Sequence, residues 1–148
     1  MGAVDDTAPS LFFRVGGMEF FEELVDSFYD GVRIDEVLLP LYPEQPDLSG
    51  ARRRLTLFLA QYWGGPVTYM EERGHPRLRM RHAPFRVGPL ERDRWLTNMA
   101  AAVESTCEQR GVAQDISEEL MTYFVSAAEH LRNDDGVSGS SPTNSPQR

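Results

Sequence analysis

LFLAQYWGGPVTYMEERGHPRLRMRHAPFRVGPLERDRWL, residues 57–96, joins the end of one expected helix to the start of the next. Gly64, Gly65 and Pro66 end the first helix abruptly, and Gly88 with Pro89 begins the second, since proline is tolerated in a first helical turn. The link between them, residues 64–88, is unusually long for a compact helical domain. Loops of that length commonly carry function, so we expect this one to hold a specific site.

The segment RGHPRLRMRHAPFR, residues 73–86, is basic in a chain whose net charge is −8. It holds five of the fifteen arginines and two of the three histidines, and it contains no acid. Positive charges this close repel one another unless negative groups join them. Acids from other helices would serve, and so would a bound anion, because the guanidinium fork matches carboxylates and phosphates. On its own, the run is more typical of a solvated patch than of a ligand site.

Outward from the link, the apolar residues recur with a helical period. In residues 17–34 a continuous stripe is formed by Phe21, Leu24, Val25, Phe28 and Tyr29. A short piece, residues 35–39, should end near Pro40. Further helices are expected from Asp47 or Ser49 to about Trp63, from Gly88 to Gly111, and from Asp115 or Ser117 to Leu131. No run alternates in the manner of strands, so the predicted fold class is all-α.

Composition predicts one domain, residues 11–132, between a flexible segment, 1–10, and a disordered tail, 133–148, whose residues are small and polar. No apolar run reaches the length of a membrane span, and residues 1–10 do not resemble a secretory signal. The acidic balance argues against nucleic-acid binding. The single cysteine, Cys107, excludes an internal disulfide and suits a cytoplasmic location.

Single residues leave their roles open. His82 follows Leu78 at helical spacing and lies near the end of a short helical turn, where its imidazole could bind a metal or face the helix C-terminus. Spacing alone favours a structural or surface role for His82, and core packing for Tyr29 and Trp95. Metal-ligand spacings such as HExxH or CxxC do not occur, and the glycines form no phosphate loop.

Together, these features meet the needs of haem. Iron takes an axial imidazole, the macrocycle takes apolar walls, and the two propionates take cations at the pocket mouth. A histidine at a helix end, aromatic inner faces and an arginine cluster would supply all three.

The stretch 57–96 closely resembles the corresponding part of group II truncated haemoglobins of the HbO type. The similarity extends through FFEELVDSFYDGV, residues 20–32, and EVLLPLYPE, residues 36–44, and covers roughly residues 12–131. The resemblance implies a two-over-two α-helical sandwich, the truncated globin fold, around one haem b. It makes His82 the axial ligand of the iron and His75 a structural residue. It makes Arg81 the first candidate for a propionate partner, and the further haem-binding candidates are Tyr69, Leu59, Arg73, Arg77, Arg79, Leu78 and Phe85.

The resemblance also implies the distal side of the pocket. Tyr29, Tyr42 and Trp95 match the family's three polar aromatic positions. Ala51 falls where many globins have a histidine or glutamine, and the same helix contributes Leu55 and Phe58. With no histidine among them, the hydrogen-bond donors to bound O₂ would be two hydroxyls and one indole N–H, which implies tight binding and slow release.

The predicted function is reversible binding of O₂, with CO, NO and peroxide as further small ligands. An unidentified reductase is an expected partner, and homo-oligomerisation stays open. Two alternatives remain: a peroxidase-like or NO-consuming enzyme that uses the same haem, and a haem-free helical module that binds an anionic partner through the arginine link.

Overall fold

The computed structural model describes residues 9–83 and 85–133. Within these ranges every regular element is helical, which confirms the predicted fold class. The elements are α2 (Leu11–Arg14), α3 (Met18–Val32), η1 (Leu39–Leu41), α4 (Ser49–Tyr62), α5 (Thr68–Arg73), α6 (Leu78–His82), α7 (Pro89–Arg110) and α8 (Gln114–Leu131). Most of the expected flexible segment, 1–10, and nearly all of the expected tail, 133–148, lie outside the described residues.

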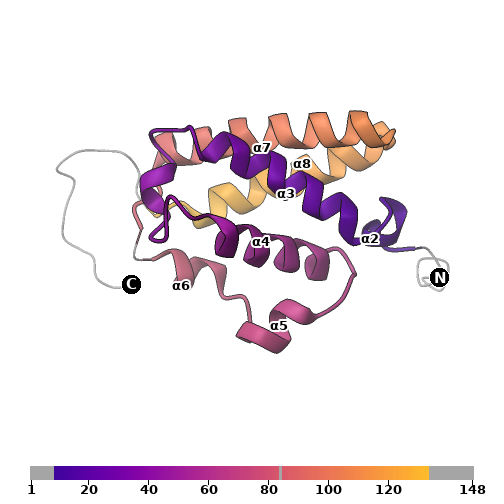
Figure 1. Ribbon diagram of the computed structural model, residues 1–148, viewed down its shortest axis with the longest axis horizontal. Coiled ribbons are helices and arrows are strands. Elements are labelled where there is room, and N and C mark those ends of the chain that lie inside the picture. The colour runs from indigo at the N-terminus through magenta and orange to yellow at the C-terminus, as the bar shows by residue number, and fades with distance from the viewer. Residues whose placement is uncertain (1–8, 84, 134–148) are drawn as a thin grey trace.

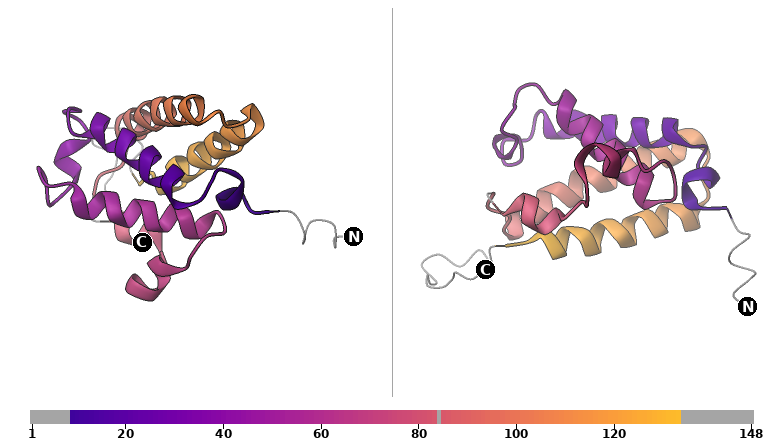
Figure 2. Two further views of the ribbon diagram at one scale, coloured as in Figure 1. Left: turned by 45° about the vertical axis from the view of Figure 1, so that its right-hand side comes forward. Right: turned by 90° about the horizontal axis from the view of Figure 1, so that it is seen from below.

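The four long helices form a two-over-two sandwich (Figures 1 and 2). Helix α3 packs against both α4 and α7, and α7 packs against α8. The predicted stripe of α3 lies at the centre, since Phe21, Leu24, Val25 and Phe28 are fully buried. This arrangement places the inner faces of α4 and α8 around a space that the link closes from one side.

Two short helices, α5 and α6, lie in the link (Figure 1). Helix α6 ends at His82, as the spacing of Leu78 and His82 indicates. Helix α5 was not predicted, because six residues are too few to show a helical period. It is held by burial of Tyr69 and by a hydrogen bond of 2.9 Å from the Met70 N–H to Gln61 Oε1.

The segment after α3 also differs from the expectation. The short piece that was expected to end near Pro40 does not end there, because Pro40 lies inside the 3₁₀ helix η1. Asp35 fixes the turn that precedes it, because its carboxylate accepts backbone N–H groups from Val37 at 2.8 Å and Leu38 at 3.0 Å. Arg94 of α7 donates to the same carboxylate at 3.1 Å, so the turn is fastened to the helix that bears Trp95.

The two glycines after Trp63 are required by close packing. Gly64 has φ of +102°, and a Cβ there would meet Ser10 at 2.5 Å. A Cβ on Gly65 would meet the Phe12 ring at 2.6 Å. The Phe12 N–H donates to the Trp63 carbonyl at 3.0 Å, so α2 lies directly over this corner. Among the described residues, none of the helices has the length and apolar character needed to cross a membrane.

Candidate functional site

A pocket of about 560 Å³ opens between the two helix pairs and the link. Its volume lies in the roughly 300–1,000 Å³ range typical of small-molecule and cofactor sites. Its lining is mainly apolar and draws on α3, the η1 loop, α4, the link, α7 and α8. Of the residues predicted for the site, it contains Tyr29, Tyr42, Ala51, Leu55, Phe58, Leu59, Tyr69, Arg73, Leu78, Arg81, His82, Phe85 and Trp95.

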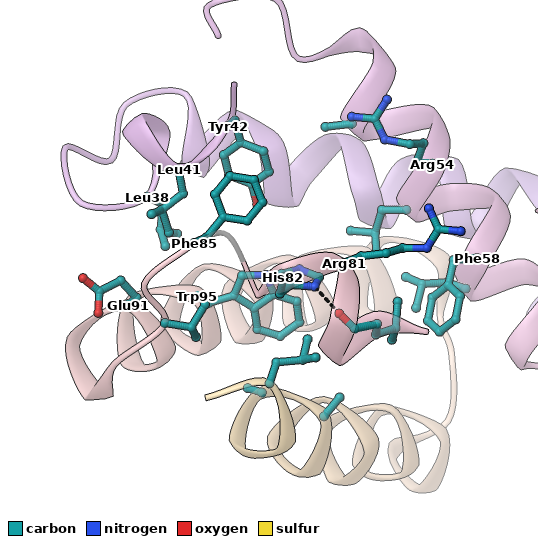
Figure 3. A pocket seen from close by; sticks show the side chains of 18 of the residues that line it. Leu38, Leu41, Tyr42, Arg54, Phe58, Arg81, His82, Phe85, Glu91 and Trp95 are labelled. Carbon is teal, nitrogen blue, oxygen red and sulfur yellow. Dashed lines mark hydrogen bonds between the residues drawn. The ribbon is translucent and has the colours of Figure 1, made fainter. Parts of the chain in front are cut away.

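His82 is the histidine of this lining. Its Nδ1 lies 2.8 Å from the Leu78 carbonyl oxygen, one turn earlier in α6 (Figure 3). Because a carbonyl can only accept, Nδ1 is the donor in this contact, and in the neutral ring the lone pair of Nε2 is available to a metal. The ring is partly buried. A histidine fixed through one nitrogen to a backbone carbonyl, with the other nitrogen available, has the arrangement typical of metal ligands.

Tyr29 and Tyr42 face each other across the end of the pocket. Their ring centroids lie 5.5 Å apart in an edge-to-face geometry. Burial raises the pKa of Tyr29 well above its ordinary value, and the hydroxyl of Tyr42 raises it further. Burial also raises the pKa of Tyr42, while the hydrogen bond with Tyr29 acts in the opposite direction. The two hydroxyls are hydrogen-bonded to each other at this end of the pocket.

Trp95 of α7 supplies the third polar aromatic side chain. Its ring packs between Phe28 and Phe124. The centroid of the Trp95 ring lies 5.3 Å from that of Phe28 and 5.8 Å from that of Phe124. Among residues 9–83 and 85–133, the indole N–H of Trp95 meets no hydrogen-bond acceptor. The packing therefore fixes the ring while its donor stays available.

The wall formed by α4 is apolar except for Arg54. Ala51 is small and buried, and Leu55, Phe58 and Leu59 follow it along the same face. No polar side chain stands at the Ala51 position, so the polar aromatic side chains at this end of the pocket come from α3, the η1 loop and α7.

Arg81 lies in the pocket wall, and its guanidinium is engaged by the link itself. Nε donates to the Pro76 carbonyl at 2.6 Å, and Nη2 donates to the carbonyls of Arg73 and His75 at 2.9 and 3.3 Å. These bonds tie the loop between α5 and α6 to helix α6, which ends at His82. Arg73 also lines the pocket, and the guanidinium carbons of Arg73 and Arg81 lie 5.9 and 6.0 Å from the centroid of the Tyr69 ring.

His75 and Arg77 are not part of the pocket lining. Arg77 is exposed, has φ of +44° and is not in the pocket lining. Its N–H donates to Nδ1 of His75 at 3.1 Å, so His75 has a local structural role, as predicted. The side chain of Arg79 is outside what the structure describes.

Sequence analysis missed one complete wall of the pocket. The inner face of α8, which was predicted only as a helix, contributes Tyr123, Phe124, Ala127, Ala128 and Leu131. A helical stripe that faces a cavity and one that faces other side chains have the same period, so the sequence carried no distinguishing signal. Several charged residues were missed as well, although their long side chains reach the pocket mouth: Glu44, Arg54, Glu91 and Arg92.

The lining fits an iron porphyrin. Within the described residues no group of three or more His, Cys, Asp or Glu side chains could hold a bare metal ion. A porphyrin supplies its own equatorial nitrogens and requires from the protein a single axial donor, apolar walls and cations at the edge. His82, the aromatic and aliphatic walls, and Arg73 with Arg81 meet those three requirements. An all-helical sandwich with such a pocket has the form of a haem-binding globin.

Comparison with known proteins also indicates a globin. Residues 10–130 match the family described as bacterial-like globin. The chain is 38% identical over 117 residues to group 2 truncated hemoglobin YjbI of Bacillus subtilis (strain 168), covering 79% of this chain and 84% of that protein. It is 51% identical to a thermostable hemoglobin from the actinobacterium Thermobifida fusca, with a TM-score of 0.79 over 84% of this chain and 98% of that one. A truncated oxygen-avid haemoglobin from Bacillus subtilis is 35% identical, with a TM-score of 0.74 over 84% and 100% of the two chains.

The chain belongs to the bacterial-like globin family and, within it, is a group II truncated haemoglobin. It therefore carries haem and binds O₂. This outcome removes the alternative of a haem-free module.

Proposed function

We propose that His82 is the axial ligand of the haem iron. The observation that supports this assignment is the 2.8 Å contact between His82 Nδ1 and the Leu78 carbonyl, in the wall of the large pocket. It fixes the tautomer and the plane of the ring, and it makes Nε2 the better electron donor. Bound haem supplies a ferrous iron that takes one diatomic ligand and shifts electron density onto O₂.

We further propose that Tyr42 and Trp95 donate hydrogen bonds to the ligand, while Tyr29 orients Tyr42. The rings of Tyr29 and Tyr42 lie in edge-to-face contact with their hydroxyls hydrogen-bonded, and we assign Tyr29 as the donor, which leaves the Tyr42 O–H for the ligand. The Trp95 N–H meets no acceptor among the described residues. A hydrogen bond to a partly charged acceptor is stronger than a neutral one. Two donors at roughly 0.5–1.5 kcal/mol each slow ligand release about tenfold to a hundredfold, because ~1.4 kcal/mol is a factor of ten. The protein thus holds O₂ tightly and is poorly suited to bulk delivery.

At the mouth of the pocket, Arg73 and Arg81 are our candidates for the propionate partners. Both line the pocket, and Arg81 has already been oriented by the carbonyls of Arg73, His75 and Pro76. A guanidinium held in this way loses little further freedom when it pairs with a carboxylate.

The test is His82→Ala against His75→Ala. Both substitutions remove an imidazole from the same link, but only His82 lines the pocket. His82→Ala should lose tight haem retention, or show the Soret band of a changed ligation state, and external imidazole should restore the parent spectrum. His75→Ala should keep the parent spectrum. An unchanged spectrum in His82→Ala would reject His82 as the ligand.

Two further proposals concern the partner protein and the cellular location. A separate reductase is our candidate for returning oxidised iron to the ferrous state. The unpaired thiol of Cys107, which is buried, suits the reducing cytoplasm.

A further inference from the structure

Tyr123 joins the pocket to the molecular surface. It belongs to the pocket wall formed by α8. On its other side, its ring lies 4.2 Å, centroid to centroid, from the ring of Tyr62 at the end of α4, with 31° between the ring planes. Tyr62 is 51% exposed. Two tyrosine rings in contact therefore lead from the haem pocket to solvent.

Other aromatic rings enclose this pair. Trp63 lies 5.6 Å from Tyr123 and 4.9 Å from Tyr62, in edge-to-face geometry with both. Phe124 lies 5.5 Å from Tyr123 and 5.8 Å from Trp95. Ligand binding and helix packing do not require two phenols at this position, because phenylalanine would fill the same space. Phenols differ from phenylalanine in that they are far easier to oxidise by one electron.

We propose that Tyr62 is a surface site at which small one-electron donors of the phenol class pass electrons, through Tyr123, into the haem pocket. The proposal uses the haem that family membership establishes, and it does not depend on which residue binds the iron.

The two tyrosines have different parts in this path. A phenol that loses an electron must also release its proton. Tyr62 can release it to water because half of its surface is exposed. Burial and the neighbouring Tyr62 raise the pKa of Tyr123 to about 12, so its proton is held more firmly. The electron is therefore taken from Tyr62 through Tyr123, and the longer-lived tyrosyl radical forms on Tyr62.

The reaction balances with hydrogen peroxide as the oxidant. One H₂O₂ takes two electrons and two protons and becomes two waters. The electrons and protons come from two phenols, each of which loses one O–H hydrogen. Without an added donor these are the Tyr62 side chains of two chains, whose radicals combine by one new carbon–carbon bond between the rings. With a donor present, two donor molecules are oxidised instead.

The experiment treats the haem-loaded protein with H₂O₂ and a nitroso spin trap, then locates the trap adduct by peptide mass spectrometry. Dityrosine fluorescence and covalent dimer are measured in parallel without the trap. The adduct is expected on Tyr62, and guaiacol, a small phenol, should suppress it. Tyr62→Phe should lose both adduct and dimer, and Tyr123→Phe should form them severalfold more slowly.

Ile34→Tyr in the Tyr62→Phe background is the matched control. Ile34 is 78% exposed and is not part of the pocket lining, so a tyrosine there offers an exposed phenol without the stacked path. It should not restore the adduct. Adducts on Tyr29, Tyr42 or Tyr69 in place of Tyr62, restoration by Ile34→Tyr, or failure of guaiacol to compete would overturn the proposal. The Soret band and the CO-bound spectrum of each variant show independently whether the haem site is intact.

Discussion

The polar aromatic residues of the pocket have different proposed roles in hydrogen bonding. In the proposed arrangement Tyr29 donates to Tyr42, and this bond uses the one phenolic proton of Tyr29. The Tyr42 hydroxyl and the Trp95 N–H stay available for a ligand. Ala51, being small and apolar, neither competes with them nor replaces them. On this proposal, ligand retention depends on donors fixed by aromatic packing.

Trp95→Phe tests this division directly. The substitution keeps an aromatic ring between Phe28 and Phe124 but removes the N–H. Loss of one hydrogen bond of about 1 kcal/mol or slightly more should accelerate O₂ release by about an order of magnitude. Stopped-flow displacement of O₂ by CO measures the rate. Trp63→Phe is the control, because Trp63 is not in the pocket lining and its indole Nε1 has no partner. An unchanged rate in Trp95→Phe would exclude the indole as a donor.

At the scale of single residues, the sequence predicted which residues line the pocket better than it predicted their hydrogen bonds. The positions of Tyr29, Tyr42, His82 and Trp95 followed from the resemblance, and all four line the pocket. The direction of the bond between the tyrosines could not be predicted, because it depends on hydroxyl orientation. The carbonyl bonds of Arg81 could not be predicted either, since they require the loop between α5 and α6 to turn back on itself.

Among the elements, α3 and α7 approach each other closely because α3 has a glycine in its last turns. A Cβ on Gly31 would overlap Oδ1 of Asn98 in α7. Asn98 cannot easily move, since its amide donates to Asp35 and to the Arg94 carbonyl at 3.1 and 3.0 Å. This contact sets the position of the helix that carries Trp95.

Gly31→Ala should therefore lower the free energy of unfolding by roughly 1–3 kcal/mol, the usual cost of overpacking, despite the better helix propensity of alanine. Urea unfolding at fixed haem saturation gives the value.

Gly50→Ala is the comparison for that experiment. A Cβ there meets the far ends of the Glu44 and Arg54 side chains, which can move away. Its effect on the free energy of unfolding should be smaller. Equal effects of the two substitutions would show that the α3–α7 contact is not tight.

The long helices were predictable and the short ones were not. Helices α3, α4, α7 and α8 have enough turns to display an apolar stripe. The six residues of α5 do not, and α5 depends on contacts with Gln61 that lie outside its own sequence. The role of α8 as a pocket wall is likewise a property of the assembled helices rather than of its own residues.

For the whole molecule, Asp35 joins the turn after α3 to α7. Burial alone would raise the pKa of its carboxyl, but hydrogen bonds from Leu38, Arg94, Val37 and Asn98 outweigh burial and hold the pKa below its ordinary value. A depressed folded-state pKa means that the unfolded chain binds the proton more readily. The contribution of Asp35 to stability is thus complete above the unfolded pKa of about 4 and is lost as pH falls through the lower folded value.

Asp35→Asn removes this titration while keeping the size of the side chain. At neutral pH the variant should have the smaller free energy of unfolding, since one amide oxygen replaces a charged acceptor of four hydrogen bonds. As pH falls from about 7 to below about 4, the two curves should converge, because the native carboxylate becomes protonated and loses its advantage. Urea unfolding of both haem-loaded proteins across that range measures the difference and cancels the acid effects that they share. Parallel curves would show that Asp35 does not couple the α3–α7 junction, and with it the position of Trp95, to pH.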